Sequence, residues 1–591
     1  MRKTHTSAVD LRGASLILAC AMCVIPFLQP RHMPPIRTFY DEWLAFSFGL
    51  AAMGLAALAR RNTAAQMPAL SFWLGLFALT LVARGLGGNA AYPQLPFLWA
   101  LYALFAAFLV LLGHDLAMRF GRERVCDTLA AFVLFGALAN SIAGVLQVVG
   151  IPPAIDSFIS YLNGKRAFGN IGQPNLYANY LTLGVASLVY LFARGKIGIT
   201  MAIAAALFLL PAAALSASRS YLLYLGYLVL LGRIALLRYE VAFGRRICIS
   251  TIALAIAGAL LQSLVPAALE AAGITIERAA SPDDWTSGMD ASTGLRLIVW
   301  QLAWQLFVAA PWLGVGPGEF SGAGFALGLP IELASDLIWT SPHNVALQLL
   351  AEAGLVGAVP IAIGLLYWAN GSTRETWRGQ SPAMWWVMAC VGVEIMHSML
   401  EFPLWYAHFL AITALLMGIG AGTGIRIRPY VTKILLASGV LGGILILAVT
   451  ARDYARFDLA IPASAGLSLA PESRAIDDRA ILRDLRNGLL APRVELMLFL
   501  ALPFEGAGLA EKIAIGERVL RVWPSSEVVG RQSVFLALAG RDEEAVALLA
   551  RGLNASKVQR RKIAAVIVAS PPAARSVLRP TLERTQTRPP G

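Results

Sequence analysis

Three side chains in this sequence could carry chemistry at the ends of predicted apolar helices: Arg219, Arg296 and His343. A charged or titratable group beside lipid is costly unless it has a partner or a function. His343 lies in Ser341-Pro-His-Asn-Val345, at the entry of a predicted apolar helix, and an imidazole can accept a proton near neutral pH. Two arginines suit a pyrophosphate, because guanidinium groups bind phosphate oxygens in pairs and keep their charge. Glu352 follows in the same predicted helix, where it could orient His343 or face the interior of a helix bundle.

Each of these residues also has a purely structural interpretation. Arg219 lies in Ser216-Ala-Ser-Arg-Ser220, between two apolar segments, and could extend toward lipid headgroups. His343 could cap a helix at the membrane interface. Asp283-Asp284 is not a separated acidic pair of the kind that holds a metal, and the predicted external segments contain no cluster of His, Asp and Cys. The sequence therefore predicts no metal and no cofactor.

The composition places these residues in a membrane protein. Of the 591 residues, 58% are hydrophobic and only 14% are charged, whereas a soluble domain is roughly 45–50% apolar. This excludes a cytosolic enzyme and a disordered scaffold. The net charge of +13 arises largely from short basic clusters between apolar segments, which favours a role in membrane orientation over nucleic-acid binding. All five cysteines fall in or beside apolar segments, so we expect reduced packing residues: Cys20, Cys23, Cys126, Cys248 and Cys390.

The apolar segments predict an all-α polytopic membrane protein with about thirteen transmembrane helices, from a window of about 19 residues. The predicted spans are 13–30, 43–60, 68–85, 97–113, 126–149, 174–193, 197–215, 218–237, 247–269, 342–368, 383–400, 403–421 and 431–450. Basic clusters alternate along the loops, which places the N-terminus in the cytoplasm and, with an odd number of spans, everything after residue 451 outside. In a Gram-negative bacterium this is a multi-pass inner-membrane protein with a periplasmic C-terminal region.

Two predicted external segments are longer than ordinary loops. The first, 270–341, contains an amphipathic stretch from Leu295 to Ala310, and a loop of this length usually has a function. The second, 451–591, contains charged amphipathic helices whose spacing resembles tetratricopeptide repeats, although an ordinary helical bundle fits equally well. We therefore predict a transmembrane domain over 1–450, with the periplasmic loop 270–341, and a periplasmic helical domain over 451–591.

Taken together, the motifs resemble the O-antigen ligase superfamily, and more closely its branch of bacterial protein O-oligosaccharyltransferases, the PglL-type pilin glycosylation ligases. Arg166-Ala-Phe-Gly-Asn-Ile-Gly-Gln-Pro-Asn175 is similar to the Gly-Gln-Pro-Asn loop of that branch. Phe402 stands where that branch would have Tyr. The other similar motifs are the opening segment from Pro26 to Trp43, Arg219, Arg296 with Trp300, Pro311 to Gly316, Pro342-His-Asn344 with Glu352, and His397 to Leu404 with Tyr406.

The resemblance implies a glycosyltransferase whose catalytic domain is the transmembrane part, 1–450. It would transfer a preassembled glycan from undecaprenyl pyrophosphate to a Ser or Thr hydroxyl of a periplasmic protein such as a pilin. No metal is implied, and direct displacement would invert the anomeric configuration. His343 would be the general base, and Arg219 with Arg296 would bind the donor pyrophosphate. The residues that would position the glycan or the acceptor are Gln173, Asn175, Tyr406, Glu401 and Glu352. Besides the donor and the acceptor, only membrane lipids are implied as partners, and no nucleic acid.

Three alternatives to this function are open. A ligase that attaches O-antigen to lipid A core, or a polymerase that extends the lipid-linked repeat, would differ only in the acceptor. The opening His32-Met-Pro-Pro35 element, the Gly-Gln-Pro-Asn loop and the long tail favour a protein acceptor. A transporter of the lipid-linked glycan would bind the same lipid without making a bond. Transporters often contain inverted repeats and broken helices at the membrane midplane, and the sequence shows no clear repeat.

The first prediction concerns topology: the loop 270–341 and the tail 451–591 lie on the same, external side of the membrane. Cysteines introduced at Ser287 and at Ser533 should both react with a membrane-impermeant thiol reagent added from the periplasm. Labelling at only one of the two positions would show that the predicted number of spans is wrong.

Overall fold

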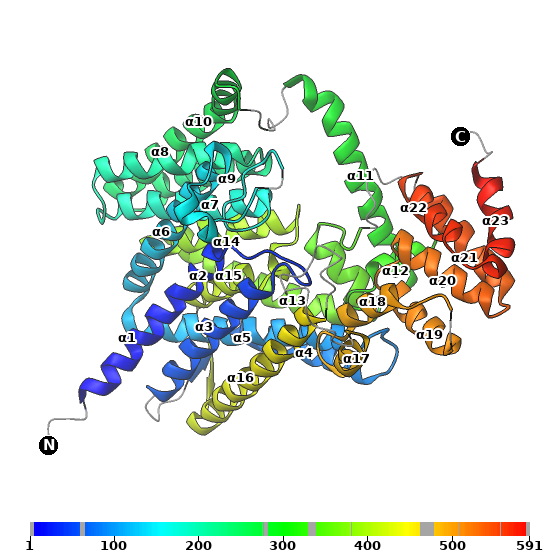
Figure 1. Cartoon of the computed structure of the whole chain (residues 1–591). Coiled ribbons are helices and arrows are strands. Elements are labelled where there is room, and N and C mark those ends of the chain that lie inside the picture. The colour runs from blue at the N-terminus through cyan, green and yellow to red at the C-terminus, as the bar shows by residue number, and fades with distance from the viewer. Residues whose placement is uncertain are drawn as a thin grey trace. The chain divides into compact units, whose positions relative to one another are not determined.

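The computed structural model confirms an all-α polytopic membrane protein (Figure 1). It describes residues 5–59, 65–162, 164–274, 276, 282–328, 339–379, 381–422, 424–460, 478–505, 507–555 and 557–586. The chain divides into two compact units. The first unit comprises Met1–Leu76, Tyr102–Asp290 and Pro360–Ala448, and the second comprises Phe77–Leu101, Ala291–Val359 and Val449–Gly591.

The first unit contains the larger number of apolar helices. Its elements are α1 (His5–Met22), α2 (Ile25–Leu28), α3 (Phe39–Leu58), β1 (Ala65–Met67), α6 (Arg122–Val149), η1 (Pro153–Phe158), α7 (Pro174–Ala193), α8 (Ile199–Leu215), α9 (Ser220–Arg238), α10 (Val241–Ala271), α14 (Pro382–Ser398), η2 (Pro403–Trp405), α15 (Ala407–Ile419) and β2 (Ile425–Ile427). Five helices belong in part to each unit: α4 (Ala69–Leu86), α5 (Gln94–Phe120), α11 (Pro282–Ala309), α13 (Val345–Arg378) and α16 (Pro429–Leu459).

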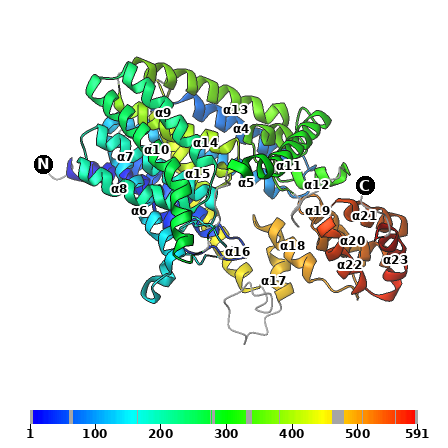
Figure 2. The same ribbon diagram turned by 90° about the horizontal axis from the view of Figure 1, so that it is seen from above.

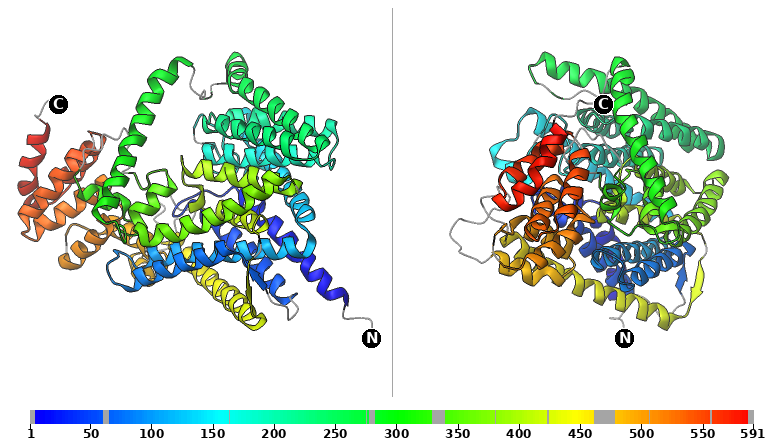
Figure 3. Two further views of the ribbon diagram at one scale, coloured as in Figure 1. Left: turned by 180° about the vertical axis from the view of Figure 1, so that it is seen from behind. Right: turned by 90° about the vertical axis from the view of Figure 1, so that its right-hand side faces the viewer.

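The second unit adds the short helix α12 (Phe320–Ala326) and the C-terminal helices. These are α17 (Asp478–Asp484), η4 (Leu485–Asn487), α18 (Ala491–Ala501), α19 (Leu509–Leu520), α20 (Ser526–Leu538), α21 (Asp542–Ala555), α22 (Lys557–Val568) and α23 (Pro572–Gln586). Figure 3 shows the last five as a compact group in which α20 packs against all of the other four. The contact between α20 and α23 is not one that repeats stacked only on their neighbours would need, and the resemblance to tetratricopeptide repeats stays a prediction.

All thirteen predicted spans coincide with helices of the structure, the twelfth as η2 followed by α15. Among the described residues, nine helices are long and apolar enough to cross a membrane, and further apolar helices such as α8 and α15 are shorter. The number of spans therefore stays a prediction.

The loops of the first unit lie at two ends. The loops at each end are predicted to share one side of the membrane. At one end, Arg122 pairs with Glu375, Arg194 pairs with Asp127 at 3.2 Å, and β1 pairs with β2 in antiparallel register. These contacts involve the segments after α3, α7 and α15, the start of α6 and the last turns of α13, all of which carry the basic clusters assigned to the cytoplasm. The loops at the other end include those before α7 and between α8 and α9. Which end faces the cytoplasm stays a prediction.

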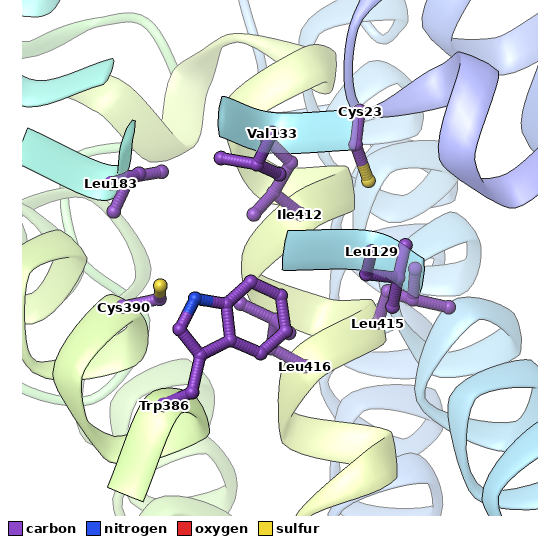
Figure 4. A pocket seen from close by; sticks show the side chains of 9 residues that line it. All are labelled: Cys23, Leu129, Val133, Leu183, Trp386, Cys390, Ile412, Leu415 and Leu416. Carbon is purple, nitrogen blue, oxygen red and sulfur yellow. The ribbon is translucent and has the colours of Figure 1, made fainter. Parts of the chain in front are cut away.

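The core of the first unit is built around α7, whose apolar window is 94% buried. A small void lies beside it, lined by Trp386, Cys23, Cys390 and aliphatic side chains (Figure 4). Its volume of about 10 Å³ is at the lower limit for one water molecule, so it is a packing defect and not a binding site. All five cysteines are buried, as expected for packing residues.

Two details of the sequence interpretation change. Ser533 has no exposed surface and donates a hydrogen bond to the carbonyl oxygen of Val529 at 3.0 Å, so a cysteine there could not be labelled. Glu543, which is exposed in the first turn of α21, is the correct position for that probe. The side chain of Ser287 lies outside the described part of the structure. The helix that contains Arg296 begins at Pro282, so Arg296 lies within α11 and does not begin it.

Candidate active site

The predicted site residues belong to both units. The first unit contains Gln173, Asn175, Arg219, Glu401 and Tyr406, and the second contains Arg296, His343 and Glu352.

In the second unit, helix α13 is broken at Gly354, where φ is 60° and ψ is −165°. The sequence predicts one continuous helix here, and that prediction is wrong. A break deprives the adjacent carbonyl and N–H groups of helical partners, which an apolar environment does not tolerate. The loop between α11 and α12 supplies those partners. Its hydrogen bonds run from Val315 N to Ala351 O at 2.8 Å, Gly316 N to Glu352 O at 3.1 Å, Leu355 N to Pro311 O at 2.8 Å, and Val356 N to Trp312 O at 3.0 Å.

This close backbone contact requires glycine on both sides. A Cβ atom at Gly354 would lie 2.5 Å from the carbonyl carbon of Trp312, and one at Gly314 would lie 2.4 Å from that of Glu352. Both residues also have positive φ, which other residues rarely adopt. The motif from Pro311 to Gly316 is therefore the segment that fills the break in α13.

Glu352 lies directly before the break and is fully buried. Its Oε1 accepts a hydrogen bond from the backbone N–H of Phe320 at 3.1 Å, and its Oε2 accepts one from Gln348 Nε2 at 2.7 Å. The Oε1 of Gln348 accepts from the hydroxyl of Ser341 at 3.0 Å, and this hydroxyl oxygen accepts from the backbone N–H of His343 at 3.1 Å. We call these five residues the Glu352 network. It connects a buried carboxylate to the backbone of the candidate base.

His343 itself is half-buried and has a φ of 52°, a left-handed conformation that costs on the order of 1 kcal/mol or more in a residue other than glycine. The side chain of Asn344 accepts the N–H of Leu347 at 3.1 Å and therefore caps α13. Trp300 Nε1 donates to the carbonyl oxygen of Pro342 at 2.9 Å and fixes the loop from α11. Because Asn344 caps the N-terminus of α13, His343 is not needed as the cap of that helix.

Arg296 precedes Trp300 by four residues in α11, so both side chains lie on one face of the helix. Since Trp300 contacts Pro342, this face is directed to the loop that carries His343. Arg296 is half-buried. Arg296 and His343 thus belong to neighbouring elements of the second unit.

The C-terminal helices are joined to the same loop through Glu319. Its buried carboxylate accepts hydrogen bonds from Arg521 at 2.9 and 2.6 Å, and from the backbone N–H of Ala91 at 2.8 Å. The next residue, Phe320, donates to Glu352. We call Glu319, Arg521 and Ala91 the Glu319 network. All three segments that it connects are predicted to be external, in agreement with the predicted topology.

A second buried carboxylate reinforces this attachment. Glu495 in α18 accepts hydrogen bonds from Arg518 at 3.0 and 2.7 Å, from Arg486 at 2.9 Å, and from the hydroxyl of Tyr92 at 2.9 Å. Burial tends to raise the pKa of Glu495, but the hydrogen bonds of these partners outweigh it, and the pKa lies below its ordinary value. The carboxylate therefore stays ionised at neutral pH.

In the first unit, two amide side chains of α6 hold the loop 160–170. Gln147 donates to the carbonyl oxygens of Ser160 and Gly169, both at 2.7 Å, and its Oε1 accepts the N–H of Gly169 at 2.9 Å. Asn140, two turns earlier on the same face, accepts the N–H of Asn170 at 3.0 Å. Neither residue is among the candidates predicted from the sequence. Their signal was an amide within an apolar helix, which usually faces a polar partner.

Arg166 joins three loops of the first unit and was also missed as a site residue. It donates to the carbonyl oxygen of Ser216 at 2.8 Å and to the side-chain oxygen of Asn175 at 2.9 Å. Asn175 in turn donates to the nearly buried carboxylate of Glu401 at 2.9 Å. Arg219 is exposed in the loop that begins at Ser216, directly before α9. Arg166 therefore fixes the loop that presents Arg219.

The other two candidates in the first unit have structural roles. Gln173 caps α7 by accepting the N–H of Leu176 at 2.6 Å. Tyr406 precedes α15, and its ring stacks on that of His408 at 5.7 Å between centroids.

His32, in the predicted external loop after residue 30, already has partners for both ring nitrogens. Its Nε2 lies 2.9 Å from the carbonyl oxygen of Asn170, and its Nδ1 lies 3.5 Å from the carboxylate of Asp41. Burial lowers the pKa of His32. A Cβ atom at Gly172 would lie 3.0 Å from this ring, so His32 supports the Gly-Gln-Pro-Asn loop.

Comparisons with known proteins match successive parts of this chain. The model of the O-antigen ligase family matches residues 203–362, a range that contains Arg219, Arg296 and His343. The model of the protein glycosylation ligase family matches residues 167–192, and the model described as virulence factor membrane-bound polymerase, C-terminal, matches 385–566. A general O-oligosaccharyltransferase of Acinetobacter baylyi is 26% identical over 469 residues, which are 76% of this chain and 77% of that protein.

Successive parts of the chain are thus similar to O-antigen ligases and to protein glycosylation ligases. The chain is an enzyme, a membrane glycosyltransferase of the oligosaccharyltransferase type. All five residues of the Glu352 network, and Glu319 of the Glu319 network, lie in the segment that the O-antigen ligase model matches.

The second prediction is that Arg521 positions the loop that carries His343, through the Glu319 network. Arg521→Met should lower the maximal rate of glycan transfer about tenfold, because a charge-assisted hydrogen bond contributes about 1.5–3 kcal/mol, and should leave the KM for the donor unchanged. Arg521→Lys, which restores the charge, should recover part of the rate. Purified protein in nanodiscs, supplied with lipid-linked glycan and acceptor, provides the measurement.

Arg541→Met is the matched control, because Arg541 forms an exposed ion pair with Glu544 on the same C-terminal helices. It should transfer glycan at the parent rate. Equal rates for Arg521→Met, Arg541→Met and the parent would show that the C-terminal helices do not position the loop.

Proposed function

We propose that this enzyme transfers a preassembled glycan from undecaprenyl pyrophosphate to a Ser or Thr hydroxyl of a periplasmic protein, such as a pilin. The proposal rests on the arrangement of the loop that carries His343. A buried network holds this loop, α11 presents Arg296 toward it, and both lie in the segment that matches the O-antigen ligase family. The protein would be an inner-membrane protein with its C-terminal helices in the periplasm.

In the proposed reaction, the acceptor hydroxyl oxygen forms a bond to the anomeric carbon of the glycan. The bond from that carbon to the pyrophosphate oxygen breaks on the opposite face, so the configuration inverts. The hydroxyl proton passes to the imidazole of His343, which makes a poor nucleophile competent. The undecaprenyl pyrophosphate leaves with increasing negative charge, which Arg219 and Arg296 stabilise through paired donors.

The remaining candidates act around this centre. Asn175 and Glu401 would position the glycan or the acceptor, because Arg166 holds them beside the Arg219 loop. Gln173 would contribute by fixing the start of α7, and Tyr406 would flank the same end of the unit. Glu352 is a positioning residue, since its carboxylate is saturated by the Glu352 network.

The protein acceptor is favoured by the match of residues 167–192 to protein glycosylation ligases, and by the Acinetobacter relative that is named an O-oligosaccharyltransferase. The match of residues 385–566 to membrane-bound polymerases favours a second candidate, a polymerase that extends the lipid-linked glycan. The two functions share the donor and differ in the acceptor.

Co-expression with a candidate pilin and a lipid-linked glycan pathway distinguishes these functions. The intact mass of the pilin should increase by the mass of one glycan only when this chain is present. An unchanged pilin mass, together with longer lipid-linked glycans, would instead identify a polymerase.

The third prediction is that His343→Ala leaves the protein folded and inserted while the transfer rate falls about 10²–10⁴-fold, the usual contribution of a positioned acid or base. Initial rates should be compared for equal amounts of purified variant and parent protein.

Asn344→Ala is the matched control, because it removes the cap of α13 and keeps the imidazole. It should cost about 1 kcal/mol of stability and retain most of the transfer rate. A His343→Ala protein with a rate comparable to that of the parent would remove His343 from the mechanism.

A further inference from the structure

A groove in the first unit has no part in the proposed reaction. It lies between α7, α8 and α10 and has a volume of about 580 Å³, within the range of about 300–1,000 Å³ that small-molecule sites occupy. Figure 2 shows these helices at one side of the first unit. The lining is apolar except at one end, where Arg245 and Arg246 stand in the second turn of α10, with Ser250 one turn further on.

The groove is hollow because its walls carry small side chains. Ala202 and Ala206 are one turn apart on α8, and Ser250 and Ala253 face them from α10. Ile203 and Ile249 at the rim are more than half exposed. In a membrane-spanning helix such surfaces face lipid, so the groove is open to the hydrocarbon.

The length of the groove matches one leaflet. From Arg245 to Leu254 the helix advances nine residues, or about 13 Å at about 1.5 Å per residue. Half of the hydrocarbon core of a bilayer is about 15 Å. A phospholipid with its headgroup at the arginines would therefore extend an acyl chain along the full groove.

The charge at the mouth is positive and uncompensated. Arg245 and Arg246 are both exposed, and among the described residues neither forms an ion pair. The nearby charges have other partners. Glu240 caps α10 by accepting the N–H groups of Ala242 and Phe243, at 3.1 and 3.3 Å. The basic groups of the neighbouring turn after α7 are paired with Asp127.

The groove is separate from the proposed donor site. Its mouth adjoins Ile199 at the start of α8, whereas the loop with Arg219 follows Leu215 at the other end. The intervening 17 residues span about 25 Å. The arginines thus lie at the end of the first unit that carries the predicted cytoplasmic loops.

We propose that this groove binds one anionic phospholipid, with the phosphate between Arg245 and Arg246 and an acyl chain between α8 and α10. Paired basic residues between membrane helices at the cytoplasmic side are suited to anionic headgroups. The small side chains of α8 and α10 leave a narrow space that suits a flexible acyl chain better than a bulky side chain of another protein.

The fourth prediction tests this site by native mass spectrometry of the full-length protein released from nanodiscs. The parent should retain one phosphatidylglycerol in preference to phosphatidylcholine. Replacing both arginines, Arg245→Gln with Arg246→Gln, should reduce that preference about tenfold. Ala253→Phe should fill the groove and reduce retention of both lipids. Arg233→Gln, which removes an exposed charge from α9 outside the groove, should behave as the parent does.

Equal phosphatidylglycerol retention by the parent, the double variant and Ala253→Phe would overturn the proposal. So would displacement of the lipid by millimolar inorganic phosphate, because it would show that the site binds the anion without the chain.

Discussion

The structure around His343 depends on one constraint: a helix broken inside an apolar region must find new partners for the backbone groups that it exposes. The break at Gly354 exposes groups on both sides, and the segment from Pro311 to Gly316 satisfies them. Because backbone approaches backbone, neither segment can move without leaving buried polar groups unpaired, at a cost of about 1–3 kcal/mol each. The break thereby fixes Glu352, and through Glu352 the loop of His343.

The two networks connect the C-terminal helices to the loop that carries His343. Arg521 in the C-terminal helices binds Glu319, and the adjacent Phe320 binds Glu352. The connection is short, and its bonds from Arg521 to Glu319 are charge-assisted. Such bonds hold geometry more strictly than apolar contacts do. Glycan transfer needs such geometry, since a hydroxyl becomes nucleophilic only while a base lies within hydrogen-bond reach.

The sequence predicts the elements better than the contacts between them. Apolar length alone predicts thirteen segments that coincide with helices of the structure, and the break before Arg219 is visible as a polar interruption. The break at Gly354 is not visible, because glycine is common in membrane helices and only the approach of another backbone reveals its role. Arg521 and Glu319 are 202 residues apart, so no local pattern relates them. Asn140 could have been recognised as an amide in an apolar helix.

Hydrogen exchange of the backbone at 339–348 tests most directly whether the carboxylate of Glu352 organises the site. In the Glu352→Gln variant, the new side-chain NH₂ group would face one of the two N–H groups that now donate hydrogen bonds to Glu352. The account predicts faster exchange at 339–348 in this variant than in the parent. Glu394→Gln, which changes a fully buried glutamate of α14 in the first unit, should leave that exchange unchanged. Equal protection of 339–348 in the parent and in Glu352→Gln would contradict the account.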